Sequence, residues 1–323
     1  MTRIDQRPLG SRFHAKSTAQ EVLDGLDLSG KNIIVTGGYS GIGFETVRAL
    51  VGAGAHVTVP ARRPDVAKAA LADISDKIVV AEMDLSDLSS VTRFATHWIN
   101  TGKPLHILIN NAGIMACAES KIGLGWENQF GTNHLGHMAL TTALLPSLRQ
   151  ASGARVIALS STAHAITDVF WEDPHFENTP YEKWAAYGQA KTANALFALA
   201  LDEREKASGI RAFSVHPGGI MTPLQRHLSD EEMVALGWKN ADGTVPEQVQ
   251  KMFKTTEQGA STTVWAATSR SLDGKGGLYC ENCDIAQLAT EDSKRWEHVR
   301  PWACDSERAE KLWAMSEKML ADG

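Results

Sequence analysis

The sequence has no long apolar run and no targeting segment. Its longest apolar stretch, residues 195–201, is much shorter than the roughly 20 residues that a membrane-spanning helix requires. The first seven residues lack the apolar core of a secretory signal peptide. These absences argue against a membrane protein and predict a cytoplasmic protein without a membrane anchor.

The sequence also lacks an excess of positive charge, and cysteine is scarce. The formal net charge is −6 at pH 7, which argues against a nucleic-acid-binding surface. There are only four Cys, and without a secretory leader their thiols are expected to stay reduced. Cys280 and Cys283 form a C-x-x-C pattern, but no second pair with zinc spacing accompanies it. A structural role for this pair is favoured over a redox or metal role, and no metal site is predicted.

The apolar residues that are present form short runs that alternate with helical patterns. This alternation is typical of a parallel sheet covered on both faces. We therefore predict an α/β fold, a single Rossmann-type doubly wound parallel sheet, in one domain over residues 1–323. Residues 1–30 are expected to form an N-terminal arm and residues 286–323 a C-terminal extension. The sequence predicts strands at 32–36, 56–60, 78–84, 105–109, 155–159 and 211–215, and a helix over about 126–148.

A glycine-rich turn lies between the first strand and the following helix. Gly37 can take a tight turn, Gly41 allows close approach of a pyrophosphate, and Gly43 lets the helix pack on the strand. The helix N-terminus offers free N–H groups to a phosphate. In this context dinucleotide binding is favoured over a plain structural turn.

The ends of the next strands refine this prediction. No acidic residue stands at the end of the second strand, whereas Arg62 or Arg63 could pair with a 2′-phosphate, which favours NADP while leaving NAD open. The alternative is that Arg62 and Arg63 are simply solvated. Asp84 ends the third strand, where a carboxylate can meet an adenine amino group. The small residues in 110–113 let the backbone pass under a flat ligand.

A tyrosine and a lysine four residues apart are the strongest candidates for chemistry. Tyr187 and Lys191 project from one face of a helix, and an ammonium lowers the pKa of a nearby phenol. Such a phenol can exchange a proton with a carbonyl or alcohol oxygen. Ser161 follows the fifth strand, at the edge where ligands bind in such sheets. The pair alone would also fit a surface tyrosine beside a solvated lysine.

Together, these motifs resemble those of the short-chain dehydrogenases/reductases over roughly residues 30–285. The glycine spacing is that of the one-domain oxidoreductase branch. Within the family, the chain is most similar to the retinol dehydrogenase group and to the catalytic part of the WW-domain oxidoreductase. No WW-domain pair or hydrophobic anchor precedes residue 30, which argues against a proline-rich partner, a membrane location and a retinoid substrate. The motifs that carry the resemblance are Thr36-Gly37-Gly38-Tyr39-Ser40-Gly41-Ile42-Gly43, Asn110-Asn111-Ala112-Gly113, Asn133, Ser161, Tyr187-x-x-x-Lys191 and Pro217-Gly218.

The resemblance implies roles for these residues. Tyr187 would be the general acid/base, and Ser161 would donate a hydrogen bond to the substrate oxygen. Lys191 would hold the nicotinamide ribose and lower the pKa of Tyr187, and Asn133 would fix a water behind the lysine. The predicted cofactor contacts are Gly37, Tyr39, Ser40, Gly41, Ile42, Gly43, Arg62, Asp84, Leu85, Asn111, Ala112, Gly113, Tyr187, Lys191, Pro217, Gly218, Ile220 and Thr222.

The predicted function is hydride transfer between NADP(H) and an alcohol, ketone or aldehyde. The substrate pocket is expected between residues 115–123, 162–184 and the segment after Thr222. Apolar residues in 223–246 suggest a mobile lid over a lipophilic substrate, with a permanently packed helix as the alternative. An NADPH-dependent double-bond reductase and a non-catalytic cofactor sensor stay open as alternatives. The resemblance also implies a homodimer or homotetramer.

Overall fold

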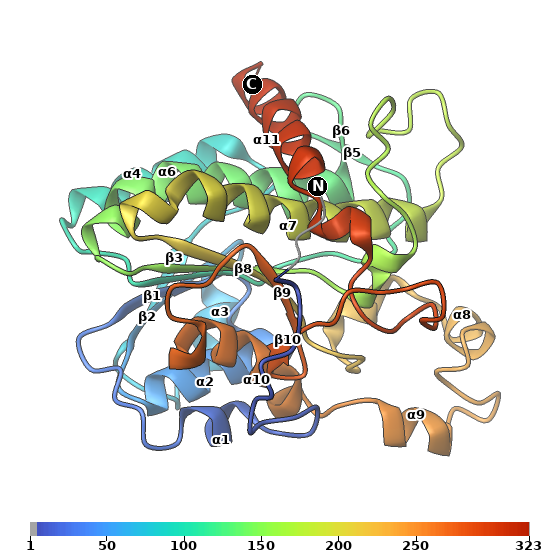
Figure 1. Cartoon of the computed structure of the whole chain (residues 1–323), viewed down its shortest axis with the longest axis horizontal. Helices are drawn as coiled ribbons and strands as arrows, with labels where there is room; N and C mark the ends of the chain where they lie inside the picture. Colours follow the sequence, from blue (N-terminus) through green and yellow to red (C-terminus); the bar gives the residue numbers. More distant parts are fainter. Residues whose placement is uncertain (1–4, 323) are drawn as a thin grey trace.

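The computed structural model describes residues 5–322 and is built around an eight-stranded sheet between two helical layers (Figure 1). The strand order is β10-β9-β8-β7-β4-β1-β2-β3. Neighbouring strands pair in parallel throughout, except that β10 runs antiparallel to β9. The strands of this sheet are β1 (Asn32–Val35), β2 (His56–Ala61), β3 (Ile78–Glu82), β4 (Ile107–Asn110), β7 (Arg155–Leu159), β8 (Arg211–His216), β9 (Leu278–Glu281) and β10 (Asp284–Ile285).

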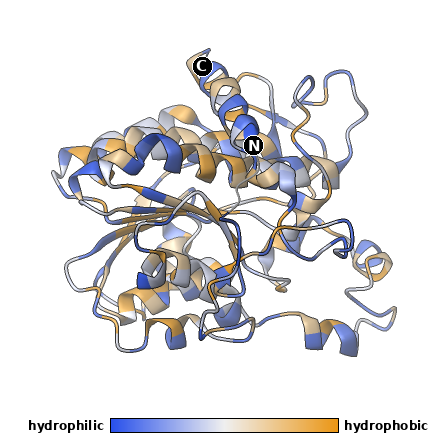
Figure 2. Cartoon of the chain, in the orientation of Figure 1, coloured by the Kyte–Doolittle hydropathy of each residue, from blue (hydrophilic) through white to orange (hydrophobic). Residues whose placement is uncertain are grey.

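Helices cover both faces of the sheet, as the sequence predicts. α4, α6, α7 and α11 lie over one face, and α1, α2, α3 and α10 lie over the other (Figure 1). The central strands are apolar on both faces because both are buried, and apolar colouring concentrates between the layers in Figure 2. The longer helices are α2 (Gly41–Gly52), α3 (Pro64–Leu71), α4 (Leu88–Asn100), α6 (Gly136–Gln150), α7 (Lys183–Glu205), α10 (Thr256–Thr268) and α11 (Ser306–Ala321), and the short ones are α1 (Ala19–Leu23), α5 (Asn128–Phe130), α8 (Asp230–Ala235) and α9 (Glu247–Met252).

The predicted helix over 126–148 is wrong at its start. A small hairpin, β5 (Lys121–Ile122) and β6 (Trp126–Glu127), precedes α5 and then a π-helical turn, Gly131–Leu135, before α6 begins. The hairpin turn carries Gly123 and Gly125, both with positive φ, which favours a reversal over a helix. The sequence prediction also missed β9, a strand of only four residues that ends in Glu281.

The N-terminal arm is tied to the far edge of the sheet. The Gln6 side chain donates to the carbonyl oxygens of Tyr279 and Ala286 and accepts from the Tyr279 N–H. The Asp284 carboxylate accepts backbone N–H groups from Leu9, Gly10 and Ser11. The arm therefore closes the β9–β10 margin with side-chain and main-chain hydrogen bonds.

The C-terminal extension packs on the domain through α11, which lies against α7. The Trp313 ring stacks on Phe197 of α7 with centroids 5.8 Å apart, and His134 is hydrogen-bonded to Ser316. No helix among residues 5–322 is long and apolar enough to cross a bilayer.

All four cysteines are free and buried. Cys280 lies in β9, and Cys283 lies in the following turn with its Sγ 3.2 Å from Ser261 Oγ. Burial raises the pKa of both thiols, so they are poor nucleophiles at neutral pH. Both side chains belong to the packed core under α10.

Candidate active site

The predicted site residues gather at the carboxyl edge of the parallel strands. β1 lies between β4 and β2, so the strand order reverses beside the turn that follows β1. A ligand in such a sheet binds in the crevice at this reversal point. The segments that follow β1, β2, β3, β4, β7 and β8 carry the predicted cofactor and catalytic residues.

The glycine-rich turn depends on the absence of side chains at two positions. Gly37 has a φ of +62°, which other residues rarely adopt. A Cβ on Gly43 would lie 2.3 Å from the Gly37 carbonyl oxygen, so only glycine lets α2 approach the turn. Ser40 is the N-cap of α2, and its side chain makes no capping hydrogen bond. The first N–H groups of α2 thus remain without a side-chain cap, as a phosphate site requires.

The segment after β4 is bonded directly to this turn. Thr36 Oγ1 accepts the N–H groups of Asn111 and Ala112, each at 2.9 Å. Asn111 Nδ2 donates to the carbonyl oxygen of Thr36 at 2.7 Å. Asn111 Oδ1 is buried and has no hydrogen-bond partner among the described residues. This orphaned acceptor and the bare glycine cradle fit a dinucleotide with hydrogen-bond donors.

The segment after β8 closes the other side of the cradle. A Cβ on Gly41 would lie 3.3 Å from Thr222 Cβ, so Thr222 sits against the glycine-rich turn. Gly218 has a φ of +108° and faces the Lys254 side chain, which leaves no room for a Cβ. The remaining predicted contacts flank the same edge: Pro217, Ile220, Tyr39, Ile42 and Leu85.

Arg62 and Asp84 mark the outer end of the predicted cofactor site. Arg62 follows β2 directly and is exposed. Asp84 lies two residues beyond β3, and its Oδ1 accepts hydrogen bonds from the N–H and the hydroxyl of Ser86. The structure therefore places both side chains at the expected strand ends.

Tyr187 and Lys191 project together from α7, and both are 4% exposed. Lys191 Nζ lies 5.5 Å from the centre of the Tyr187 ring and donates to the carbonyl oxygen of Leu159 at 3.0 Å. Asn194 Nδ2 donates to the same carbonyl, and Ser160 Oγ donates to the Lys191 carbonyl at 2.7 Å. These bonds fix the α7 side chains against the end of β7.

Asn133 reaches the same point from the π-helical turn. Its side chain exchanges two hydrogen bonds of 2.9 Å with the backbone N–H and carbonyl of Ile114. A Cβ on Gly113 would lie 3.1 Å from Asn133 Oδ1 and 3.7 Å from Lys191 Nζ. Gly113 is therefore the point where the Asn133 and Lys191 side chains meet the segment after β4.

Ser161 completes the predicted catalytic group. It is the N-cap of a 3-10 turn, Thr162–Ala165, and its Oγ accepts the Ala163 N–H. The hydroxyl proton is therefore left for another acceptor. A hydrogen bond with Ser161 acts to lower the pKa of Tyr187, which places the two hydroxyls together.

The expected pKa of Tyr187 is corrected by the structure. Burial raises the pKa of this phenol well above its usual range and outweighs the hydrogen bond from Ser161. Burial also lowers the pKa of Lys191 to about 8, so its ammonium form still predominates at neutral pH. Desolvation, which residue spacing does not reveal, dominates at both groups.

An apolar cluster covers the Tyr187 side of the site. Met115, Ala116, Ala163 and Leu228 are buried with Tyr187 in this cluster. Side chains of the predicted lid pack on it, including Leu224, Met233 and Trp238. The Trp184 ring contacts both Tyr187 and Trp238 edge-on, with centroids 6.4 and 6.1 Å apart. The segments expected to line the substrate pocket are thus brought together, except that Leu236 is exposed.

Sequence reasoning missed two buried histidines that hold this site. His137 Nε2 is 2.9 Å from Thr36 Oγ1, and its Nδ1 is 2.9 Å from the Asn133 carbonyl oxygen. His164 lies three residues after Ser161 and contacts its carbonyl oxygen at 2.6 Å. Their only signal in the sequence is proximity to predicted site residues. Residues 5–322 contain no group of three or more His, Cys, Asp or Glu side chains that could hold a metal ion.

Comparisons with known proteins agree with this geometry. The family model for short chain dehydrogenases matches residues 31–233. A Streptomyces lividans protein named "Probable oxidoreductase" is 43% identical over 92% of this chain and 100% of its own length. Human retinol dehydrogenase 12 is 35% identical over 91% of this chain and 88% of its own.

Solved structures give the same result. A Mycobacterium paratuberculosis protein of known structure has a TM-score of 0.70 and 31% identity, over 92% of this chain and 96% of its own. An NADP active-site complex of Pseudomonas aeruginosa RhlG has a TM-score of 0.61 and 25% identity, over 79% of this chain and 95% of its own. The motifs, the Rossmann-type sheet and these relatives together establish that this chain belongs to the short-chain dehydrogenase/reductase family of NAD(P)-dependent oxidoreductases.

Proposed function

We propose that this protein is an NADP(H)-dependent oxidoreductase that interconverts a lipophilic alcohol and its ketone or aldehyde. The observation that carries the proposal is the convergence of Ser161, Tyr187, Lys191 and Asn133 beside a cradle shaped for a dinucleotide. Bound in the cradle, a nicotinamide would supply or accept the hydride.

The chain's own residues would manage the proton and the charge on the substrate oxygen. In carbonyl reduction, Tyr187 Oη gives its proton to the oxygen that becomes the alcohol, while the Ser161 hydroxyl donates a hydrogen bond to that oxygen. The Lys191 ammonium, 5.5 Å from the Tyr187 ring, stabilises the phenolate left behind. This help matters because burial alone disfavours the phenolate. Asn133 holds the backbone of Ile114 under the lysine.

The preference for NADP(H) rests on the end of β2. Arg62 is exposed there, and residues 61–63 carry no carboxylate to bond a ribose 2′-hydroxyl. A guanidinium forms charge-assisted hydrogen bonds with a 2′-phosphate. The RhlG structure, a complex with NADP, is in keeping with this choice.

The preference for a lipophilic substrate rests on the apolar cluster around Tyr187. Residues 223–246 would act as a lid, because Leu224, Met233 and Trp238 pack against the apolar cluster that contains Tyr187. Only polar groups of the catalytic residues would then meet the substrate oxygen, while apolar side chains bury the rest of the molecule. Relatives named for retinol, a lipophilic alcohol, support this class without identifying the compound.

A substrate panel with both coenzymes tests the proposal. Purified protein is given NADPH or NADH with butanal, decanal, 2-decanone and 2-cyclohexenone, and products are identified by mass spectrometry. We expect decanal or 2-decanone to be reduced at the carbonyl, with NADPH preferred. Reduction of the ring double bond of 2-cyclohexenone would instead indicate a double-bond reductase. Coenzyme binding without turnover of any carbonyl or of the matching alcohols would indicate a cofactor sensor.

Single substitutions test the coenzyme preference separately. Arg62→Ala is expected to weaken NADPH binding about tenfold or more and leave NADH binding unchanged, because a charge-assisted pair contributes about 1.5–3 kcal/mol. Arg63→Ala, which changes the neighbouring exposed arginine, is the matched comparison. Equal loss for both coenzymes in Arg62→Ala would overturn the assignment.

A further inference from the structure

His164 connects the C-terminal extension to the residue predicted to bind the substrate oxygen. It lies in the 3-10 turn that follows Ser161 and is 2% exposed. Its imidazole contacts the nearby Ser161 carbonyl and two groups distant in sequence, the Tyr279 hydroxyl of β9 and the Arg300 backbone. Nothing in hydride transfer requires a histidine at this place.

The contacts determine which imidazole nitrogen carries the proton. The Arg300 backbone N–H lies 3.1 Å from His164 Nε2 and can only donate, so Nε2 must accept. A neutral imidazole has one donor and one acceptor, so Nδ1 carries the proton. Nδ1 then donates to the Ser161 carbonyl oxygen at 2.6 Å. Burial lowers the pKa of His164 to about 4, so the ring is neutral at neutral pH.

Tyr279 fixes the same carbonyl from another direction. Its hydroxyl donates to the Ser161 carbonyl oxygen at 3.1 Å, and its ring lies 4.9 Å from the His164 ring. The His164 backbone N–H donates to that oxygen as well. On the other side of Ser161, Oγ accepts the Ala163 N–H. With both its carbonyl and its hydroxyl oxygen held, Ser161 has little freedom to turn its hydroxyl proton away from Tyr187.

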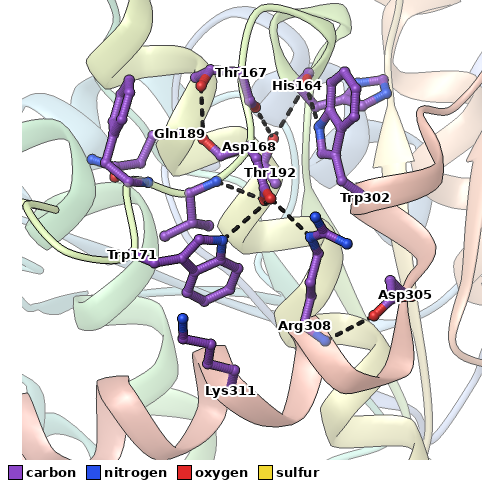
Figure 3. A network of polar contacts seen from close by, with 12 residues as sticks. His164, Thr167, Asp168, Trp171, Gln189, Thr192, Trp302, Asp305, Arg308 and Lys311 are labelled. Carbon is purple, nitrogen blue, oxygen red and sulfur yellow. Dashed lines mark hydrogen bonds and ion pairs between the residues drawn. The ribbon is translucent and has the colours of Figure 1, made fainter. Parts of the chain in front are cut away.

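The C-terminal extension supplies the outer half of this network (Figure 3). Trp302 Nε1 donates to the His164 carbonyl oxygen at 3.1 Å, beside the bond from Thr192 Oγ1. Further along the segment between Ser161 and Tyr187, Asp168 accepts hydrogen bonds from Trp171 and from Arg308 of α11. Two separate points of the segment between Ser161 and Tyr187 are therefore anchored to the extension.

We propose that His164 is a positioning residue that locks Ser161 for catalysis and makes the C-terminal extension part of the active-site support. The proposal rests on the proposed function, since Ser161 must act on the substrate oxygen. The proposal makes two predictions for the protein without substrate or coenzyme. His164 carries its proton on Nδ1, and the Ser161–Ala165 turn is rigid because of its hydrogen bond from Trp302.

A double-mutant cycle with Ser161 tests the coupling, using decanal reduction by NADPH as the assay. His164→Leu is expected to lower kcat about tenfold, the equivalent of one buried hydrogen bond. In a Ser161→Ala background the same change should lower kcat less than about twofold, because the hydroxyl that His164 positions is already absent. Equal losses in both backgrounds would overturn the proposal. If Ser161→Ala alone does not slow the reaction, the proposed function fails instead.

The double-mutant cycle is repeated with Tyr279→Phe, which perturbs the packing less than His164→Leu. This second cycle tests the coupling to Ser161 if His164→Leu does not fold. It removes the hydroxyl and keeps the packed ring, so we expect a loss of about threefold to tenfold that vanishes in the Ser161→Ala background. A loss that persists there counts against positioning through Ser161.

Two readouts need no turnover. In ¹⁵N NMR of the imidazoles, His164 should show the neutral form with Nδ1 protonated, and a protonated Nε2 would refute the assignment. Trp302→Phe should increase hydrogen exchange of residues 161–165 about tenfold, because it removes the Nε1 bond. Trp313→Phe is the matched control, since Trp313 Nε1 has no partner among the described residues. Equal exchange in the two variants would contradict the anchoring role of the extension.

Discussion

The cofactor side and the substrate side of this site are held in place by different means. On the cofactor side, close backbone approaches at Gly37 and Gly43 set the geometry, and neighbouring loops are hydrogen-bonded to each other directly. On the substrate side, contacts between segments as distant in sequence as His164 and Arg300, 136 positions apart, hold the segment between Ser161 and Tyr187. The glycine positions of the cofactor side can be recognised in a short stretch of sequence. The long-range contacts of the substrate side cannot.

Tyr187→Phe should give the largest effect, because Tyr187 lies where the two sides meet. Loss of general acid/base catalysis is expected to lower kcat by about 10²–10⁴-fold. NADPH affinity should change less than about threefold, since the ring and its packing remain. Stopped-flow reduction of decanal and fluorescence titration of NADPH measure the two quantities. Retention of more than about a tenth of the rate would remove Tyr187 from its assigned role.

Gly43→Ala should break the cofactor side alone. The new Cβ would lie 2.3 Å from the Gly37 oxygen and 2.6 Å from Asn111 Nδ2. We expect about 1–3 kcal/mol of lost stability and at least tenfold weaker NADPH binding, because rigid backbone must shift. Gly52→Ala, at the end of the same helix, is the control, since its Cβ would meet only Gln20 Oε1 at 3.8 Å. Urea unfolding and NADPH titration of both variants give the comparison; similar effects would refute it.

Trp238→Ala should affect the substrate side alone. Its ring packs edge-on against Trp184 and against Phe253, above the cluster around Tyr187. Loss of this apolar contact should raise KM for decanal about tenfold, with little change for butanal or NADPH. Trp296→Ala, which removes a tryptophan that is 51% exposed, should leave all three constants unchanged. A rise in KM for NADPH would show that the two sides are not separable at this position.

The smallest expected effect is a pH dependence of kcat/KM that reports the charge of Lys191, which lies between the cofactor side and the substrate side. Lys191 loses its charge as pH rises through its pKa of about 8, so kcat/KM for carbonyl reduction should fall on the alkaline side. Between pH ~7 and ~8 the loss is only about twofold, because half of the lysines are neutral at the pKa. Initial rates across the pH range measure the profile. A flat profile up to pH ~9 would contradict it, and Lys191→Met, although slow, should lack the alkaline fall.

Most of the sheet and the cofactor side could be predicted from sequence. The turn at Gly37, Gly41 and Gly43 follows from local backbone geometry, and the strand at 155–159 was placed to the residue. Tyr187 and Lys191 share a helix face by the helical period alone. These features depend on residues close together in the chain.

The rest required three-dimensional information. The hairpin at β5–β6 interrupts a pattern that reads as one helix, and β9 was too short to stand out. The direction of the Tyr187 pKa was wrong because spacing gives the neighbouring charge but not the depth of burial. The contacts of His164 with Tyr279 and Arg300 leave no periodic signal at all.

The attachment of Gln6 to the last parallel strand has a consequence for synthesis on the ribosome. Gln6 precedes Tyr279, its partner, by 273 positions, so Gln6 leaves the ribosome long before Tyr279 does. The hydrogen bonds of the arm therefore cannot form until β9 has been translated. Docking of the arm must then follow the synthesis of the strand to which it is attached.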